Sequence, residues 1–267
     1  MLTAVQTEAV FSLIYKVGEY IRTERTRFNA SAVENKDVHD LVSYVDKNSE
    51  KLLSDQLVKI LPGSYCRGEE FGEGDRSAGD FCWVIDPLDG TTNFIHNIPH
   101  YCISVGLQHK EETIAGWVYE VAGDRMFYAS EGNGAFLNGK AIGVSNNSEL
   151  SKCLIGTGFP VRKYDKLDEY LEVLKWMIEN TRGVRRLGTA AYDLCLVASG
   201  VLDAFYETGL SIWDVCAGAL IVKESGGSVS DFSGGKEYLE GRQIVATNGK
   251  IHDPVRAVIA SKMISSF

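Results

Sequence analysis

Apolar residues near the start of the chain recur with the period of an α-helix, and polar residues fill the positions between them. The apolar face of this segment is formed by Val10, Leu13, Ile14, Val17 and Ile21. A surface helix that buries one apolar stripe shows this pattern. We therefore predict that the chain begins with an amphipathic helix.

A second amphipathic helix is predicted to start at about Asp46. Its inner stripe is predicted to consist of Leu52, Leu53, Leu57 and Ile60. Polar residues 46–49 offer side chains that cap a first turn, and the Leu-Pro-Gly sequence at 61–63 ends the helix. The segment 68–75 is rich in glycine and glutamate, so we predict a polar loop there.

The pattern changes between residues 101 and 144, where short β-prone runs alternate with turns. The runs are residues 103–107, 114–119, 126–129 and 135–137. Glycine-containing turn sequences separate most of them, and such sequences are typical of hairpins. This region is therefore predicted to form an antiparallel meander.

Strand-like and helix-like segments alternate after residue 145. Strands are predicted at 154–156, 204–206, 229–232 and 244–246, and helices at 170–178, 189–199, 215–224 and from 253 onward. No repeat or flexible linker interrupts the sequence. We predict the α/β (α+β) class and one compact unit of two halves, an N-terminal α+β half (1–145) and a C-terminal α/β half (146–267).

Composition and charge exclude several classes of function. The chain has 267 residues, of which 45% are hydrophobic and 24% charged, as in an ordinary globular protein. A net charge of −9 argues against direct binding of nucleic acid or of an anionic membrane. Neither a secretory signal nor an apolar run of roughly 20 residues is found, and the six scattered cysteines indicate free thiols. We expect a cytoplasmic protein.

A buried strand at 81–85 ends in two acids, Asp86 and Asp89. Two carboxylates at the end of a buried strand repel each other and are poorly hydrated unless a cation lies between them. A hard divalent metal is one explanation, with Pro87 fixing the turn between the acids. The other explanation is a simple turn, because Asp-Pro and Asp-Gly are common turn formers.

Two further features add to this pattern. Gly90 and Thr91 follow the second acid and offer backbone N–H groups that suit a phosphate. Asp214, after Trp213, opens a helix of small residues. An acid in the first turn also complements the helix dipole, so Asp214 alone is ambiguous.

The run 86–94, Asp-Pro-Leu-Asp-Gly-Thr-Thr-Asn-Phe, resembles the first signature of the inositol monophosphatase family of Mg-dependent sugar phosphatases. Trp213-Asp214, with its small-residue helix and the later Gly226-Gly227, resembles the second signature. Further matches are found at 40–46, 68–70, 188–191 and Glu207. The resemblance covers nearly the whole chain and is closest to the bacterial inositol-1-monophosphatase branch. It implies a layered αβαβα fold and a homodimer.

The resemblance also implies roles for individual residues. The ligands of two Mg²⁺ ions, with a weaker third ion near the first of them, would be Glu69, Asp86, the Leu88 carbonyl, Asp89 and Asp214. The attacking water would be oriented by Thr91 together with Glu69 or Asp46. The phosphate would be held by the backbone N–H groups of Gly90 and Thr91. The sugar hydroxyls would meet the Ala190 backbone, Glu207 and one oxygen of Asp89.

Elementary electrostatics agrees with these implied roles. Four carboxylates offset the charge of two or three Mg²⁺ ions, which in turn screen a phosphate and lower the pKa of bound water, so no histidine base is needed. Glu70 competes with Glu69 as a ligand. Lys36 resembles a basic residue of the metal-site loop but is by itself a surface charge. The pair Arg185-Arg186 is able to face a phosphate, although a solvated pair is the favoured interpretation.

The activity implied by the resemblance is Mg²⁺-dependent hydrolysis of myo-inositol monophosphate or a similar polyol phosphate. Thr92-Asn93-Phe94 resembles the inositol branch, whereas the nucleotide branch usually has lysine after Gly-Thr. The alternative substrates are fructose 1,6-bisphosphate, histidinol phosphate, NADP and nucleotide 3′-phosphates. A non-catalytic role in transcription complexes is a further alternative, but the presence of all four acids favours an enzyme. Inhibition by lithium is also implied.

Overall fold

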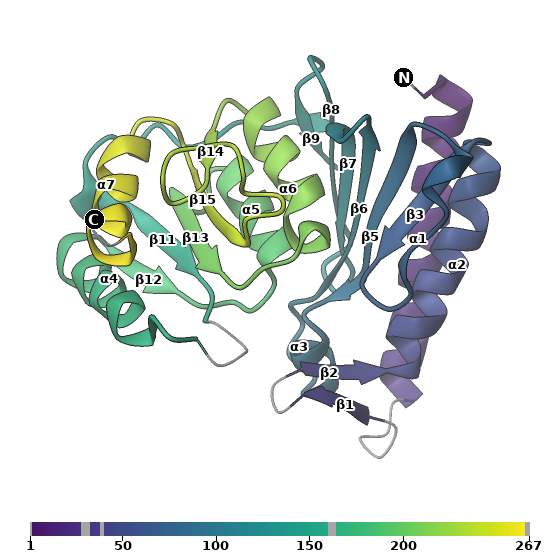
Figure 1. Ribbon diagram of the computed structural model, residues 1–267, viewed down its shortest axis with the longest axis horizontal. Coiled ribbons are helices and arrows are strands. Elements are labelled where there is room, and N and C mark those ends of the chain that lie inside the picture. Colours follow the sequence, from purple (N-terminus) through teal and green to yellow (C-terminus); the bar gives the residue numbers. More distant parts are fainter. Residues whose placement is uncertain (1, 28–32, 38–39, 160–163, 265–267) are drawn as a thin grey trace.

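The computed structural model describes residues 2–27, 33–37, 40–159 and 164–264, and in this part of the chain two large sheets alternate with three layers of helices (Figure 1). One face of the first sheet is covered by α1 (Ala4–Arg27) and α2 (Tyr44–Ile60). The layer between the sheets is formed by α5 (Ala190–Ala198) and α6 (Ile212–Glu224). The outer layer is formed by α4 (Leu167–Asn180) and α7 (His252–Met263). The predicted αβαβα layering is confirmed.

The first sheet has eight strands in the order β10-β9-β8-β7-β6-β5-β3-β4. The strands are β3 (Ser64–Gly68), β4 (Gly72–Glu73), β5 (Phe81–Asp89), β6 (Cys102–His109), β7 (Glu112–Glu120), β8 (Arg125–Ser130), β9 (Ala135–Leu137) and β10 (Lys140–Ala141). Strands β5 to β10 pair antiparallel with their sequence neighbours, which confirms the predicted meander. A separate ribbon pairs β1 (Val33–Asp37) with β2 (Asp40–Ser43).

Strand β3 is not predicted by the sequence pattern, although it matters for the site. It pairs parallel to β5, with Gly68 opposite Ile85. Its residues alternate only weakly between apolar and polar, so the period of a strand is hidden. The predicted loop at 68–75 is also partly wrong, because β4 lies within it and pairs with β3.

The predicted inner stripe of α2 is wrong at Leu52, which is 39% exposed. The buried face instead includes Val45, Leu53 and Leu57 at intervals of four and eight residues. Because successive helical residues are rotated by about 100°, Leu52 points well away from Leu53. Because Leu52 and Leu53 are adjacent, the sequence alone does not show which of the two faces the core. Ile60 is partly buried, as its place near the helix end allows.

The second sheet has five strands in the order β12-β11-β13-β15-β14. The strands are β11 (Leu154–Thr157), β12 (Gly183–Arg185), β13 (Ala204–Thr208), β14 (Ser228–Ser230) and β15 (Gln243–Thr247). Strand β11 pairs parallel to β12 and β13, and the other pairs are antiparallel, so the sheet of the predicted α/β region is mixed. The short β12 is not predicted, and β14 ends two residues earlier than expected.

Helices α5 and α6 are buried almost all round, because each is covered by sheet residues on both sides. Small residues let α6 approach the first sheet closely. A Cβ atom at Gly116 would lie 2.8 Å from the Cα of Ala217, so only glycine fits that point of β7. We call the surface where β5–β8 meet α5 and α6 the seam. At the seam α6, the helix that carries Asp214, contacts β5, β6, β7 and β8 of the first sheet.

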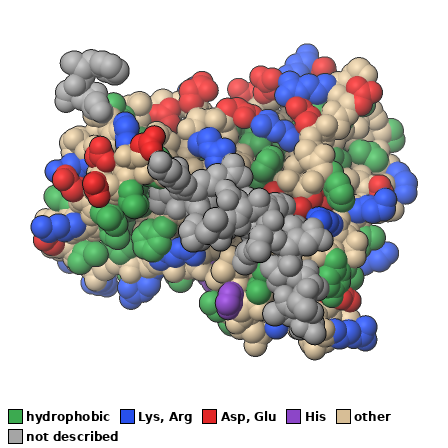
Figure 2. Space-filling view, turned by 60° about the horizontal axis from the view of Figure 1, so that its bottom comes forward, with side chains coloured by type: hydrophobic (Ala, Val, Ile, Leu, Met, Phe, Trp, Pro, Cys, Tyr) green, Lys and Arg blue, Asp and Glu red, His purple; other side chains and the backbone are tan. Residues whose placement is uncertain are grey.

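Figure 2 turns the bottom of Figure 1 forward, where the ribbon of β1 and β2 lies. Among the side chains drawn in colour on this face, acidic and basic residues are interspersed. Within the ranges that the structure describes, no helix is long and apolar enough to cross a membrane.

Candidate metal and phosphate site

The two acids of the first motif lie at the end of β5, where the strand leaves its regular pairing with β6 between Asp86 and Asp89. Asp86 is 1% exposed, and its Oδ1 accepts a hydrogen bond of 2.9 Å from the backbone N–H of Leu88. The carboxylate therefore stabilises the turn that separates the two acids. Turn formation and ligand chemistry are compatible here, because each acid has two oxygens.

Thr91 connects this turn to the start of α2. Its hydroxyl donates to Oδ1 of Asp46 at 2.8 Å and lies 3.1 Å from the Leu88 carbonyl oxygen. Oδ2 of Asp46 accepts from the backbone N–H of Ser43 at 2.9 Å, which caps α2. Burial raises the pKa of Asp46, and the hydrogen bonds from Ser43 and Thr91 oppose that rise. Thr91 and Asp46, two of the residues that the family resemblance implies for orienting the attacking water, are thus joined by a hydrogen bond.

Gly90 is the tightest point of the motif. It has a φ of 93°, and a Cβ atom there would lie 2.4 Å from Cγ2 of Thr189 and 3.0 Å from the His100 carbonyl oxygen. Glycine is therefore required both by its backbone conformation and by its neighbours. The chain continues directly into α3 (Thr91–Ile95), a short helix that the sequence pattern does not predict. The motif is thereby packed against the start of α5.

Glu69 lies beside Asp86 because β3 runs parallel to β5. The backbone N–H of Glu69 donates to the Ile85 carbonyl at 3.2 Å, and Glu69 is one of the charges that raise the pKa of Asp86. The next turn is held by buried Glu50, which accepts from the N–H groups of Glu70 and Phe71 at 2.7 and 3.0 Å. This placement favours Glu69 over Glu70 as the acid that faces the site.

Asp214 comes to the same place from α6. Its Oδ2 accepts from the backbone N–H of Ser211 at 2.6 Å, so it caps the helix as the simpler interpretation expects. Its charge also raises the pKa values of Asp86, Asp89 and Glu207, which puts it within electrostatic reach of all three. The cap therefore fixes an acid at the seam.

Buried negative charge accumulates at this point. Burial raises the pKa of Asp86 well above its usual range, and Glu69, Asp89 and Asp214 raise it further. Burial and then Asp214 raise the pKa of Asp89 to about 8, although a hydrogen bond from Ala191 opposes the rise. In the described part of the chain no three acidic, histidine or cysteine side chains form a closed metal-ligand group. The acids are thus electrostatically coupled without being tightly clustered.

The donor set nevertheless fits a hard divalent cation. It consists of carboxylate oxygens and one backbone carbonyl, the ligands that Mg²⁺ prefers. The raised pKa values of Asp86 and Asp89 show that protein cations do not offset the buried charge, whereas a bound cation would favour the ionised acids.

The residues predicted to meet the sugar lie on the α5 side of Asp89. Oδ2 of Asp89 accepts from the Ala191 N–H at 2.8 Å, and Ala190 begins the helix. Glu207 lies on β13 in the second sheet. Burial, then Asp193 and Asp214, raise the pKa of Glu207 well above its usual range. The structure therefore brings Asp89, Ala190 and Glu207 into one region, which we call the leaving-group side.

One charged residue of the leaving-group side escapes sequence reasoning. Asp193 is 1% exposed, and burial followed by the charge of Asp89 raises its pKa well above the usual range. In the sequence it is an ordinary helix acid, so only its spacing of four from Thr189 connects it to the start of α5. Arg186 opposes the raised pKa values of Asp89, Asp193 and Glu207, so it lies near all three. The side chain of Lys36 lies outside the described part of the structure.

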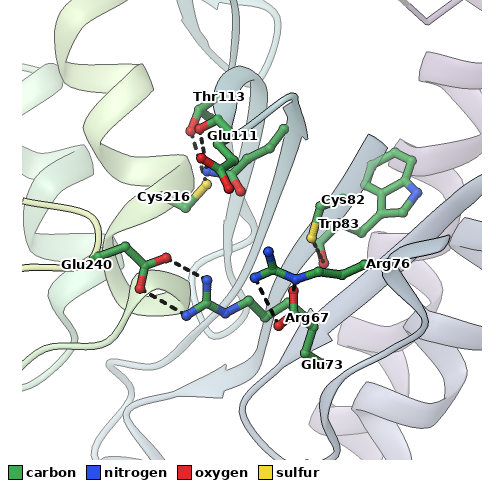
Figure 3. A network of polar contacts seen from close by, with 10 residues as sticks. Arg67, Glu73, Arg76, Cys82, Trp83, Glu111, Thr113, Cys216 and Glu240 are labelled. Carbon is green, nitrogen blue, oxygen red and sulfur yellow. Dashed lines mark hydrogen bonds and ion pairs between the residues drawn. The ribbon is translucent and has the colours of Figure 1, made fainter. Parts of the chain in front are cut away.

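A second polar region borders the seam, near the beginning of β5 (Figure 3). Arg67 donates to both carboxylate oxygens of Glu240, at 2.5 and 3.0 Å, and thereby joins β3 to the C-terminal half. Arg76 makes the equivalent pair of bonds to Glu73, at 2.5 and 3.1 Å. Figure 3 shows both arginines with their partners, below the contact of Thr113 with Cys216. We call these residues the paired-charge region.

The layered fold and the buried acids at the end of β5 define a class of α/β protein, and comparison with known proteins identifies its family. The inositol monophosphatase family model matches residues 3–264. A putative Nus factor SuhB of Neisseria meningitidis is 42% identical over 251 residues, 94% of this chain and 96% of the relative. An inositol-1-monophosphatase of Rhizobium meliloti is 37% identical over 258 residues, 97% and 96% of the two chains.

Solved structures agree with these matches. The crystal structure of the extragenic suppressor protein suhB from Bartonella henselae has a TM-score of 0.90 at 34% identity, covering 96% of this chain and 98% of the other. The chain therefore belongs to the inositol monophosphatase family. Members of this family are generally metal-dependent.

Proposed function

We propose that the chain is a Mg²⁺-dependent phosphomonoesterase that hydrolyses myo-inositol monophosphate, or a similar polyol phosphate, to the free polyol and phosphate. The observation that carries the proposal is the buried acid group at the seam, where Asp86, Asp89 and Asp214 come together electrostatically with Glu69 beside them. Family membership and the relative named inositol-1-monophosphatase support the substrate class.

Two or three Mg²⁺ ions are the cofactors that we propose. Their ligands would be Glu69, Asp86, the Leu88 carbonyl, Asp89 and Asp214. Bound there, the ions would screen the charge of a phosphate and lower the pKa of the water that attacks phosphorus.

Thr91 and Asp46 are proposed to orient that water. The Thr91 hydroxyl donates its proton toward Asp46, so its oxygen lone pairs stay available to accept a hydrogen bond from water. Ser43 and the start of α2 hold Asp46 in place. The backbone N–H groups of Gly90 and Thr91 are proposed to hold the phosphate, as the tight turn and the start of α3 support.

The polyol is proposed to lie on the leaving-group side. Oδ2 of Asp89 is held by the Ala191 N–H, which leaves Oδ1 to accept a hydrogen bond from a substrate hydroxyl. Glu207 and the Ala190 backbone are proposed to meet further hydroxyls. These groups are largely buried, so a substrate without hydroxyls would leave them without hydrogen-bond partners, at a cost in binding free energy. The site should therefore favour a hydroxyl-rich substrate.

Phosphate release from inositol 1-phosphate tests the proposal, with protein stripped by chelator and assayed with and without Mg²⁺. Asp86→Asn should lower the rate at least roughly 100-fold. Asp80→Asn is a matched control, because Asp80 is an exposed acid just before β5 that pairs with Lys110. Equal rates with and without Mg²⁺ would contradict the metal mechanism. A metal-dependent rate that survives Asp86→Asn would contradict the site. Inhibition by lithium is expected as well.

We further propose that residues 1–145 and 146–267 act as two halves of one unit, and that the active form is a homodimer, as the family resemblance implies. Light scattering tests the homodimer, which a monomeric mass at assay concentrations would contradict. Limited proteolysis tests the two-half division, which predicts that cutting concentrates near residue 145.

A second candidate function is a binding role in a transcription complex, which relatives named Nus factor SuhB support. Such a role would use the protein surface and would not need the buried acids. Asp86→Asn therefore separates the two functions. A binding role predicts that this variant still binds purified transcription complexes, and loss of binding together with loss of catalysis would contradict an independent role.

A further inference from the structure

The loop that carries Glu69 is held through three successive backbone N–H groups. Strands β3 and β4 pair antiparallel, and residues 69–71 connect them. The N–H of Glu69 donates to the Ile85 carbonyl oxygen of β5 at 3.2 Å. The N–H groups of the next two residues donate to the carboxylate of Glu50, at 2.7 and 3.0 Å. One side chain of α2 therefore holds the second half of this loop.

Glu50 also fits closely against the residue before the loop. Its side chain is 1% exposed, and a Cβ atom at Gly68 would lie 2.2 Å from Oε1 and 2.7 Å from Oε2 of Glu50. The carboxylate thus occupies the space that a side chain at position 68 would need. Backbone N–H groups that donate to a carboxylate form charge-assisted hydrogen bonds, which are stronger than neutral ones. The contact is therefore both tight and specific for an acid.

Helix α2 connects this loop to the other end of the site. Glu50 follows Asp46 by four residues, so the two acids lie on the same face of the helix. Asp46 accepts from the Thr91 hydroxyl at 2.8 Å, and α2 packs against β3 and β5 (Figure 1). One face of α2 thus holds Thr91 with one acid and the loop of Glu69 with the next.

Packing of apolar side chains contributes little to the order of the loop. Phe71 is 62% exposed, and both residues of β4 are exposed. Order in such a surface segment depends on its hydrogen bonds. Loss of Glu50 should therefore loosen residues 69–71 and leave the core of the first sheet intact, because water reaches the released N–H groups.

We propose that Glu50 is a positioning residue, which fixes the loop 69–71 so that Glu69 is held ready to bind the cation at the end of β5. This inference rests on the proposed metal-dependent function. Groups that orient a metal ligand from behind typically change metal affinity roughly 10- to 100-fold when they are removed. A purely structural role of Glu50 would instead lower stability and leave metal affinity unchanged.

The test is Mn²⁺ titration of chelator-treated protein, followed by electron paramagnetic resonance, with thermal unfolding of the metal-free forms alongside. Glu50→Ala should weaken one class of Mn²⁺ sites roughly 10- to 100-fold, while the sites that do not use Glu69 persist. Asp55→Asn is the matched control, because Asp55 is an exposed acid of the same helix that pairs with Lys51 at 4.0 Å. This control should bind Mn²⁺ like the original protein.

Two conservative variants separate position from charge. Glu50→Gln keeps the length of the side chain and one acceptor oxygen, so its loss of affinity should be intermediate. Glu50→Asp keeps the charge but is one methylene shorter, so its loss should approach that of Glu50→Ala. If Glu50→Asp binds like the original protein while Glu50→Gln binds like Glu50→Ala, long-range charge explains the effect and the proposal is overturned.

Gly68→Ala disturbs the same contact from the other side. Its Cβ atom should displace the Glu50 carboxylate and weaken the same class of Mn²⁺ sites. The double variant with Glu50→Ala should bind no more weakly than Glu50→Ala alone, because the group that is displaced is already gone. Multiplied losses would contradict the contact on which the proposal depends. If Glu50→Ala does not fold, Glu50→Gln and Gly68→Ala decide the question.

The remaining outcomes separate this inference from the proposed function. Mn²⁺ affinity that is unchanged in Glu50→Ala, with a lower Tm, overturns the positioning role alone. If the original protein binds Mn²⁺ but releases no phosphate from inositol 1-phosphate with Mg²⁺, the proposed function fails and Mn²⁺ binding still decides the role of Glu50. If the original protein binds no Mn²⁺, both proposals fail.

Discussion

Two polar regions border the same seam, and they differ in how their charges are balanced. In the paired-charge region Arg67 meets Glu240 and Arg76 meets Glu73, and each pair is at least partly exposed to solvent. At the other end of β5, Asp86 is fully surrounded by protein and its closest charges are further acids. The first region is balanced by the protein itself, whereas the second is not, and we propose that a bound cation balances it.

This difference suits the two regions to different roles: we assign the paired-charge region to stability and the buried acids to the proposed chemistry. Exposed ion pairs contribute little to stability and nothing to catalysis unless they face a substrate. Buried acids that repel one another lower the stability of the folded chain, so their presence is explained by a function that uses them. Changes in the acid region should therefore affect activity, and changes in the paired-charge region should affect stability alone.

The largest expected effect is the loss of activity in Asp214→Asn. The asparagine oxygen still accepts the hydrogen bond from Ser211, so the cap of α6 is kept. The buried charge is lost, and kcat should fall roughly 100- to 1,000-fold. Thermal unfolding should show that the variant is at least as stable without metal, because a repulsive charge has been removed. A variant with full activity would place Asp214 outside the chemistry.

The local parts of the site were predictable from sequence, because each motif is contiguous. Asp86 and Asp89 are separated by a single turn, and the buried strand before them is plain in the sequence. The meander was predictable for the same reason, since its pairs join neighbouring strands. Asp214 was tied to the site only by the family resemblance, because the helix cap explains it equally well.

The rest depends on packing that no local pattern reports. Strand β3 brings Glu69 to Asp86 through a parallel pairing with β5, and its own sequence does not alternate. Arg185 and Arg186 are adjacent and identical in type, so the sequence does not predict that their contacts differ. In the folded chain Arg185 donates to a backbone carbonyl, whereas Arg186 lies over an aromatic ring. Asp193 becomes unusual only in the folded chain, where it is buried and lies within electrostatic reach of Asp89.

Thr91 offers the next largest effect. Thr91→Val removes the hydroxyl that donates to Asp46 and keeps the shape of the side chain, so kcat should fall roughly 100-fold. Thr91→Ser keeps the hydroxyl and should retain most of the activity. Steady-state kinetics of both variants provides the measurement. Equal rates for Val and Ser would show that the hydroxyl does not orient water.

Metal binding should also change how stability depends on pH. The pKa of Asp89 is about 8 in the folded protein against an ordinary value of 3.8, chiefly because the group is buried. The folded protein then keeps a proton that the unfolded chain has released. The stability of metal-free protein should therefore decline as pH rises from about 4 to about 8. Mg²⁺ requires the ionised acid, so its stabilising effect should grow over the same range.

Thermal unfolding at pH 5.5 and pH 8, each with and without saturating Mg²⁺, measures this effect. At about one hundred times the dissociation constant, a ligand of the folded state adds roughly 2.7 kcal/mol. We expect the larger increase in Tm at pH 8. An increase that is independent of pH would contradict a site made of buried acids with raised pKa values.

The smallest effect is expected in the paired-charge region. Glu240→Gln breaks the bidentate contact with Arg67, and since Glu240 has a half-exposed side chain the cost should be at most about 1 kcal/mol of unfolding free energy. The rate of phosphate release should stay within about twofold of the original. Denaturant unfolding combined with the same assay checks both values. A large loss of activity would contradict the claim that the paired-charge region affects stability alone.

Metal binding itself is the most direct test of the central claim that the buried acids at the seam form a metal site. Mn²⁺ titration of chelator-treated protein, followed by electron paramagnetic resonance, counts the bound ions without any substrate. The account predicts at least two sites per chain in the original protein and in Glu240→Gln, and a lost or strongly weakened site in Asp86→Asn. Mn²⁺ binding that is the same in Asp86→Asn as in the original protein would contradict it.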